Sequence, residues 1–177
     1  DAGAVLIEEG QIAEVYHEGA DAPAGAAVVD CGGKCLAPGI IDIGVKVCEP
    51  GERHKESFRT AGLAAAAGGV TTMVTRPDTI PTVDTPETLE FAKRRGAEMT
   101  DIRIAPMASL TKARAGREMV EMGFLQDAGA VAFTDGDHVV ADTKVLSRAM
   151  VYARSLGALV TGHPQEPVLS DGAAVTS

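Results

Sequence analysis

A short apolar run between two turn signals constrains this chain most. Residues 37–51 read APGIIDIGVKVCEPG, so that a Pro-Gly turn leads into β-branched residues and a Glu-Pro-Gly turn ends them. A continuous apolar run of this length is typical of a strand that is buried on both faces. We therefore predict a strand over residues 40–47, and we expect it to be the first strand of a parallel sheet.

The chain after this strand alternates between two patterns. Short β-branched runs predict further strands, and Ala-rich or amphipathic runs predict helices; Thr85 before Pro86 is a typical helix start. Alternating strands and helices indicate an α/β fold with a parallel sheet and right-handed crossovers. The further strands are expected at 70–75, 102–105, 130–134 and 159–161, and the helices at 56–67, 85–95, 116–128 and 142–156.

Five strands and four helices make about five-eighths of a (β/α)₈ TIM barrel, which takes about 250 residues. An open piece of a barrel would expose unpaired strand edges. We therefore predict that residues 38–177 are the N-terminal part of such a barrel and that the chain is a fragment. A complete five-stranded flavodoxin-like domain is the alternative.

Residues 1–37 differ from the rest of the chain. Two short apolar runs at 4–7 and 11–15 are separated by a turn that contains Gly10, and a third run follows at 27–30. This pattern predicts strands without intervening helices. We interpret residues 1–37 as part of a small β-sandwich domain.

Composition excludes several classes of function. A net charge of −9 and an aromatic content of 3% argue against a nucleic-acid surface. No apolar run is long enough to span a membrane. The three cysteines, Cys31, Cys35 and Cys48, lack CxxC spacing, which favours free thiols over a metal site formed by the three. We expect a cytoplasmic protein that binds neither nucleic acid nor membrane.

The motifs of the chain resemble those of the dihydroorotase family of cyclic amidohydrolases. Residues 38–51 resemble the family's first barrel strand, which reads roughly PGFIDMHVHLREPG. The resemblance implies a barrel whose His-x-His pair holds zinc and whose following Arg grips a substrate carboxylate. It also implies hydrolysis or closure of a cyclic amide in pyrimidine biosynthesis by zinc-activated water. Further resembling stretches lie at 68–72, 76–81, 106–112, 129–136 and 159–166.

Four positions depart from the family pattern. Gly44 and Lys46 stand in place of the two histidines, and Cys48 stands in place of the Arg. Glycine offers no ligand, an ammonium repels a divalent cation, and a thiol cannot replace the bidentate grip of an Arg. Asp78 replaces a neutral amide and would repel an anionic substrate. Arg76 lies two residues before Asp78, and we expect its side chain on the other face.

Two family metal positions keep residues that can bind a metal, Asp135 and His163. Two ligands are too few for a tight zinc site, which needs about three. The resemblance places the family's further His and its Asp base after Ser177. One hypothesis is that Lys46 pairs with Asp135 and takes the place of the metal charge.

Two classes of function follow from the resemblance. In the first, the protein is a non-catalytic dihydroorotase homologue without zinc, a homo-oligomer that acts as structural partner of aspartate carbamoyltransferase. In the second, it is an active zinc-dependent dihydroorotase or a related cyclic amide hydrolase. A third, weaker reading is an enzyme with metal-free chemistry at Lys46.

Overall fold

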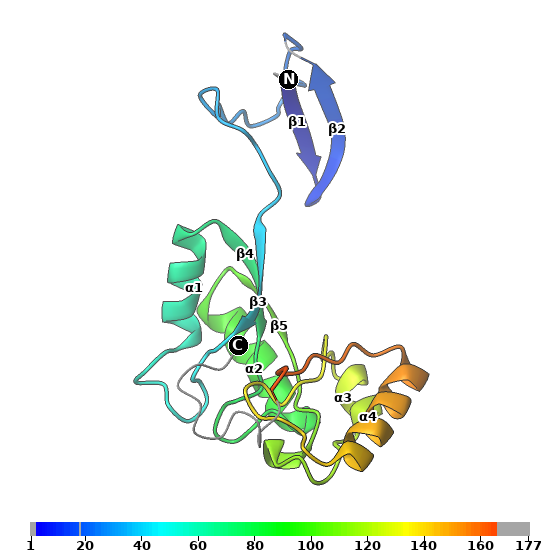
Figure 1. Ribbon diagram of the computed structural model, residues 1–177. Coiled ribbons are helices and arrows are strands. Elements are labelled where there is room, and N and C mark those ends of the chain that lie inside the picture. The colour runs from blue at the N-terminus through cyan, green and yellow to red at the C-terminus, as the bar shows by residue number, and fades with distance from the viewer. Residues whose placement is uncertain (1–2, 18, 166–177) are drawn as a thin grey trace. The chain divides into compact units, whose positions relative to one another are not determined.

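The computed structural model describes residues 3–17 and 19–165, and the chain divides into two compact units, Asp1–Pro38 and Gly39–Ser177. The first unit contains the antiparallel hairpin of β1 (Gly3–Glu8) and β2 (Gln11–His17), as Figure 1 shows. Its turn contains Gly10 at a φ of +77°, a conformation that suits glycine. Residues 27–30 form no strand, so the expected third strand was wrong.

The second unit is built on a parallel sheet. Strands β3 (Ile40–Val45), β4 (Val70–Thr75) and β5 (Arg103–Pro106) lie in that order. Single parallel bridges continue the series from Ala108 to Phe133 and from Phe133 to Val160. Each new strand or bridged segment is therefore added beside the previous one, although the strands expected at 130–134 and 159–161 form only these single bridges. A flavodoxin-like order would place the first strand between the second and the third, so this alternative was wrong.

Within residues 39–165, four α-helices and one 3₁₀ helix lie between these strands or after them (Figure 1). The expected helix over 116–128 is much shorter, because Gly116 has a φ of +68° and Met119 pairs with Thr111 as a β-bridge. Residues 116–121 are therefore not helical. The helices are α1 (Phe58–Ala67), α2 (Pro86–Met99), η1 (Lys112–Arg114), α3 (Met122–Asp127) and α4 (Thr143–Leu156).

The helix starts follow local capping chemistry. The Thr85 side chain accepts a hydrogen bond from the Thr88 amide, and the Thr88 hydroxyl accepts one from the Thr85 amide. Pro86 is the first helical residue, as the sequence predicted. Such reciprocal capping satisfies two amides that have no partner within the helix.

Two apolar clusters hold the second unit together. In the first cluster, Phe58 of α1 and Ala92 of α2 pack with Met73 of β4, so that α1 and α2 lie against the sheet. The second cluster joins α2 to α3, α4 and the bridged segment around Phe133, through residues that include Leu89, Leu125 and Ala149. The packed helices therefore hold the strands, and the loops that follow them, in fixed positions.

Strand β3 is less buried than the sequence predicted. Ile40, Ile41 and Ile43 are 55–70% exposed, so burial on both faces was wrong for the described residues. The reason is that, within residues 3–17 and 19–165, β3 pairs only with β4. In the same part of the chain, no helix has the length and hydropathy needed to cross a bilayer.

Close packing of α2 on β5 leads to a first prediction. A Cβ at Gly96 would lie 2.5 Å from Ile104 Cγ1 and 2.9 Å from Ile104 Cβ. We expect Gly96→Val to lower the free energy of unfolding by about 1–3 kcal/mol, since the core must shift to accept it. Urea unfolding measures this loss. Gly123→Val in α3 is the control, because only the Tyr152 hydroxyl lies near that position, and an equal loss in both variants would contradict the argument.

Candidate functional site

A buried carboxylate lies where the strands of the sheet end. The Asp78 side chain is 2% exposed and is held by two cations. Lys46 Nζ lies 2.9 Å from Asp78 Oδ2. Arg76 donates from Nε to Asp78 Oδ1 at 3.1 Å and from Nη2 to Oδ2 at 2.8 Å. This fork of two parallel bonds is the strongest geometry for such a pair.

The fold explains why these three residues meet. Lys46 directly follows β3 and Arg76 directly follows β4, and the carboxyl ends of neighbouring parallel strands lie at the same edge of a sheet. Arg76 and Asp78 are two residues apart, and such residues share a face in extended chain. The expectation that Arg76 points to the other face was therefore wrong.

The ion pairs continue to Asp137, in the loop that follows the bridged residue Phe133. Arg76 Nη2 lies 3.4 Å from Asp137 Oδ1. Arg114, in η1, donates to the same Asp137 oxygen and donates from Nε to the Asp135 carbonyl at 2.9 Å. We call Lys46, Asp78, Arg76, Asp137 and Arg114 the strand-end ion network. The network links the segments after β3, after β4 and after Phe133 to the loop of η1.

Lys46 belongs to this network and pairs with Asp78. The hydrogen bond to Asp78 and the charge of that carboxylate raise the pKa of Lys46 above its ordinary value. The side chain therefore stays an ammonium, which is neither a metal ligand nor a base. The hypothesis that it pairs with Asp135 was wrong, since the carboxylate within ion-pair distance is that of Asp78.

Asp135 has a structural role in this chain. Its Oδ1 accepts hydrogen bonds from the amides of Leu110 and Thr111, both at 2.9 Å, and the Thr111 hydroxyl donates to its Oδ2. The residue is 3% exposed. Both oxygens are thus used in fixing the chain after β5.

Gly44, Cys48 and His163, the other positions that the family resemblance singles out, do not form a set of metal ligands. Gly44 has a φ of +90°, where an L side chain costs roughly 1–2 kcal/mol. Cys48 is a buried free thiol. His163 is exposed, and its Nε2 lies 3.0 Å from Gln165 Oε1. Glu166, the end of the last resembling stretch, lies outside the described residues.

These residues do not fit a tight zinc site. The family resemblance assigns metal ligands to four positions in this chain, which are Gly44, Lys46, Asp135 and His163. Gly44 has no side chain, Lys46 is a cation, and Asp135 already accepts three hydrogen bonds. No group of three or more His, Cys, Asp or Glu side chains that could hold a metal occurs between residues 3 and 165, position 18 aside. His163 alone cannot supply the roughly three ligands that catalytic zinc requires.

Glu49 is a buried acid that motif reasoning did not single out. Its Oε1 accepts from Arg95 Nε of α2 at 2.8 Å, and its Oε2 accepts from the Phe58 amide at the start of α1 at 3.0 Å. Burial raises the pKa of Glu49, but the bonds from Arg95 and Phe58 and the charge of Arg53 outweigh it and lower the pKa below 4.5. Glu49 thereby ties the loop after β3 to two helices.

This arrangement predicts a pH-dependent loss of stability. At neutral pH, Glu49→Gln should lower the free energy of unfolding by about 1.5–3 kcal/mol, because Arg95 loses its charged acceptor. Since folding lowers the pKa of Glu49, the contribution is complete above pH 4.5 and is lost as the pH falls through the folded value. Urea unfolding from pH 7 to pH 3 measures the narrowing gap between wild type and variant.

Glu98→Gln is the matched control for this experiment. Glu98 also pairs with Arg95, at 3.6 Å, but it is 51% exposed. Exposed pairs contribute about 0–1 kcal/mol. A gap that stays constant with pH for Glu49→Gln, or equal losses in the two variants, would contradict the role assigned to Glu49.

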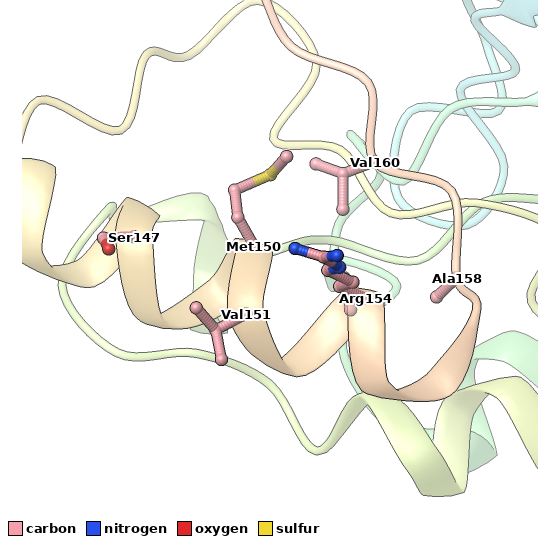
Figure 2. Close-up of a pocket in the computed structure, with 7 residues that line it drawn as sticks. Ser147, Met150, Val151, Arg154, Ala158 and Val160 are labelled. Atoms are coloured by element: carbon pink, nitrogen blue, oxygen red, sulfur yellow. The ribbon is translucent and has the colours of Figure 1, made fainter.

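A separate groove lies along α4. Figure 2 shows Met150 and Arg154 of the helix on the side of Val160, which belongs to the following segment, and Ser147, Val151, Ala153 and Ala158 complete the lining. Its lining is mainly apolar, and none of its residues belongs to the strand-end ion network. The groove and the charged site are therefore different features.

Comparison with known proteins agrees with the motif resemblance. The profile of the family described as Dihydro-orotase-like matches residues 33–177. The chain is 39% identical over 171 residues to a dihydroorotase of Geobacillus thermodenitrificans, covering 97% of this chain and 40% of the relative. It is 40% identical over 166 residues to a dihydroorotase of Sulfurihydrogenibium sp., covering 94% and 39%.

A solved structure shows the same fold. The L-hydantoinase (dihydropyrimidinase) from Arthrobacter aurescens matches with a TM-score of 0.77 at 22% identity. The match covers 91% of this chain and 36% of that protein. The chain thus spans about two-fifths of the length of the curated relatives that it matches.

Proposed function

Because the chain belongs to the dihydroorotase-like family, we propose that it is part of a non-catalytic dihydroorotase homologue of pyrimidine biosynthesis. In this proposal, residues 39–165 belong to the first part of a (β/α)₈ barrel, and the β1–β2 hairpin belongs to a small β-sandwich. The sequential order of the parallel strands and the likeness to the hydantoinase support the barrel.

One observation carries the loss of catalysis. Lys46 occupies a family zinc position as an ammonium held 2.9 Å from Asp78. A metal at that point would have to displace the ammonium from the buried Asp78 carboxylate, because two cations at one position repel each other. The raised pKa of Lys46 also argues against the metal-free enzyme, because a nucleophilic or basic amine must be neutral.

The retained scaffold supports a structural role. Glu49 and Asp135 keep fully bonded, buried positions beside a ligand set that no longer fits zinc. Loops that are held in a fixed geometry can present a binding surface even where they do not bind zinc. We propose that its partner is aspartate carbamoyltransferase, the preceding enzyme that the family resemblance implies, and that the protein is a homo-oligomer. The alternative remains an active zinc-dependent dihydroorotase.

Metal content and turnover decide between these functions. For the full-length protein purified in zinc-containing buffer, we expect far less than one zinc per chain and no measurable dihydroorotate hydrolysis. A dihydroorotase with the family's metal ligands, prepared in parallel, is the positive control. Stoichiometric zinc with turnover on the order of 1 s⁻¹, an ordinary enzyme rate, would establish the alternative.

The partner is tested separately. We expect purified full-length protein and the aspartate carbamoyltransferase of the same organism to elute together in size-exclusion chromatography, with a mass by light scattering above that of either alone. The carbamoyltransferase of an unrelated organism serves as control. Independent elution at concentrations of about 10 μM would remove the structural-partner proposal while leaving the loss of catalysis intact.

A further inference from the structure

Two largely buried guanidinium groups converge on one exposed carboxylate. The side chains of Arg114 and Arg76 are 12% and 24% exposed, whereas that of Asp137 is 57% exposed. Both cations use an Nη2 atom to reach the same oxygen, Asp137 Oδ1. The cations are thus fixed from within the fold, and the acid approaches them from the solvent side.

The backbone around Gly136 shows how close the two guanidinium groups are. A Cβ at this residue would lie 3.0 Å from Arg76 Nη2 and 3.4 Å from Arg114 Nη2. Gly136 has a φ of +67°, which allows this approach. Two like charges that share so small a space require a neighbouring anion.

Among the six charged residues of the network and Asp135, the positive and negative charges balance only when Asp137 is included. Lys46, Arg76 and Arg114 carry three positive charges, and Asp78, Asp135 and Asp137 carry three negative ones. Asp78 and Asp135 are buried and bonded to donors of their own. Asp137 is therefore the one member of this set that an outside anion could replace, and its removal leaves a net charge of +1.

The fixed positions of the cations carry an inference that does not depend on the proposed function. We propose that Arg76 and Arg114 form an anion site whose internal ligand is Asp137, and that the vacated site takes a small monocarboxylate. A planar carboxylate matches guanidinium donors, and its single charge restores neutrality. With Asp137 in place, the site is closed to other anions.

The protonation of Asp137 agrees with this role. Partial burial raises the pKa of this carboxyl, but a backbone hydrogen bond and the charges of Arg114 and Arg76 outweigh burial and lower the pKa below its ordinary value. His138, on the same loop, lies with Nδ1 3.1 Å from the Arg114 carbonyl. Asp137 is thus an anion at neutral pH and occupies the site as such.

Chemical rescue tests the proposal on the full-length protein. Asp137→Ala should lower the melting temperature in chloride buffer at pH 7.5 by a few degrees, about 2–6 °C. Replacing 100 mM sodium chloride by 100 mM sodium acetate should recover at least half of this loss. Acetate should leave the wild type unchanged. Asp101→Ala is the control, because it removes the same charge from an exposed position outside the network.

Further variants and outcomes bear on the proposal. Asp137→Asn should lose stability without rescue, since its amide fills the space that acetate would take. Equal acetate effects in wild type, Asp101→Ala and Asp137→Ala, or an unchanged melting temperature in Asp137→Ala, would overturn the proposal. Phosphate rescuing better than acetate at matched ionic strength would overturn the monocarboxylate class. If Asp137→Ala folds only in acetate the proposal is supported, and failure in both buffers overturns it.

Discussion

The arrangement at the strand ends depends on burying the Asp78 carboxylate. An ionised group without a partner in a protein interior costs several kcal/mol, so a 2% exposed carboxylate needs fixed counter-charges. Arg76 supplies a two-bond fork, and Lys46 supplies a third contact from the neighbouring strand. The loops after β3 and β4 are thereby joined by charge, and Arg76 extends the link to Asp137.

This dependence changes the meaning of two substitutions that look independent in the sequence. Lys46 beside a neutral amide would lack the negative charge that pairs with its ammonium, and Asp78 beside a neutral histidine would lose one of its two cations. Together they form a pair at 2.9 Å. At the two positions where the family resemblance implies a metal ligand and an amide, this chain therefore has two residues that depend on each other. The ion pairs that Asp78 forms with Lys46 and Arg76 stabilise the resulting site.

Much of the fold was predictable because its signals are local. Strand β4 occupies the predicted residues 70–75, and the Thr85–Pro86 start of α2 follows from capping chemistry within four residues. The helix expected over 116–128 failed because a bridge between Thr111 and Met119 competes with the apolar periodicity. The strand at 27–30 was predicted from three apolar residues, and a run that short does not specify a pairing partner.

The candidate site was less predictable, since its contacts join residues far apart in the chain. Motif positions directed attention to Lys46, Asp78 and Asp135, but spacing alone could not assign their partners. The i, i+2 spacing of Arg76 and Asp78 was the one usable signal, because it places both side chains on the same face. Arg114 gave no signal, as its role depends on a left-handed turn, with Ala113 at φ +49° and Arg114 itself at +56°.

Asp135 has a structural role that joins it to the strand-end ion network. A carboxylate at a metal position ordinarily keeps an oxygen free for the cation, whereas here two amides and the Thr111 hydroxyl take both. Thr111 in turn accepts from the Gly116 amide, so that Asp135 organises the turn that presents Arg114. Arg114 returns a hydrogen bond to the Asp135 carbonyl. Asp135 therefore helps to position Arg114, a cation of the network, and its hydrogen bonds fix the shape of the loop.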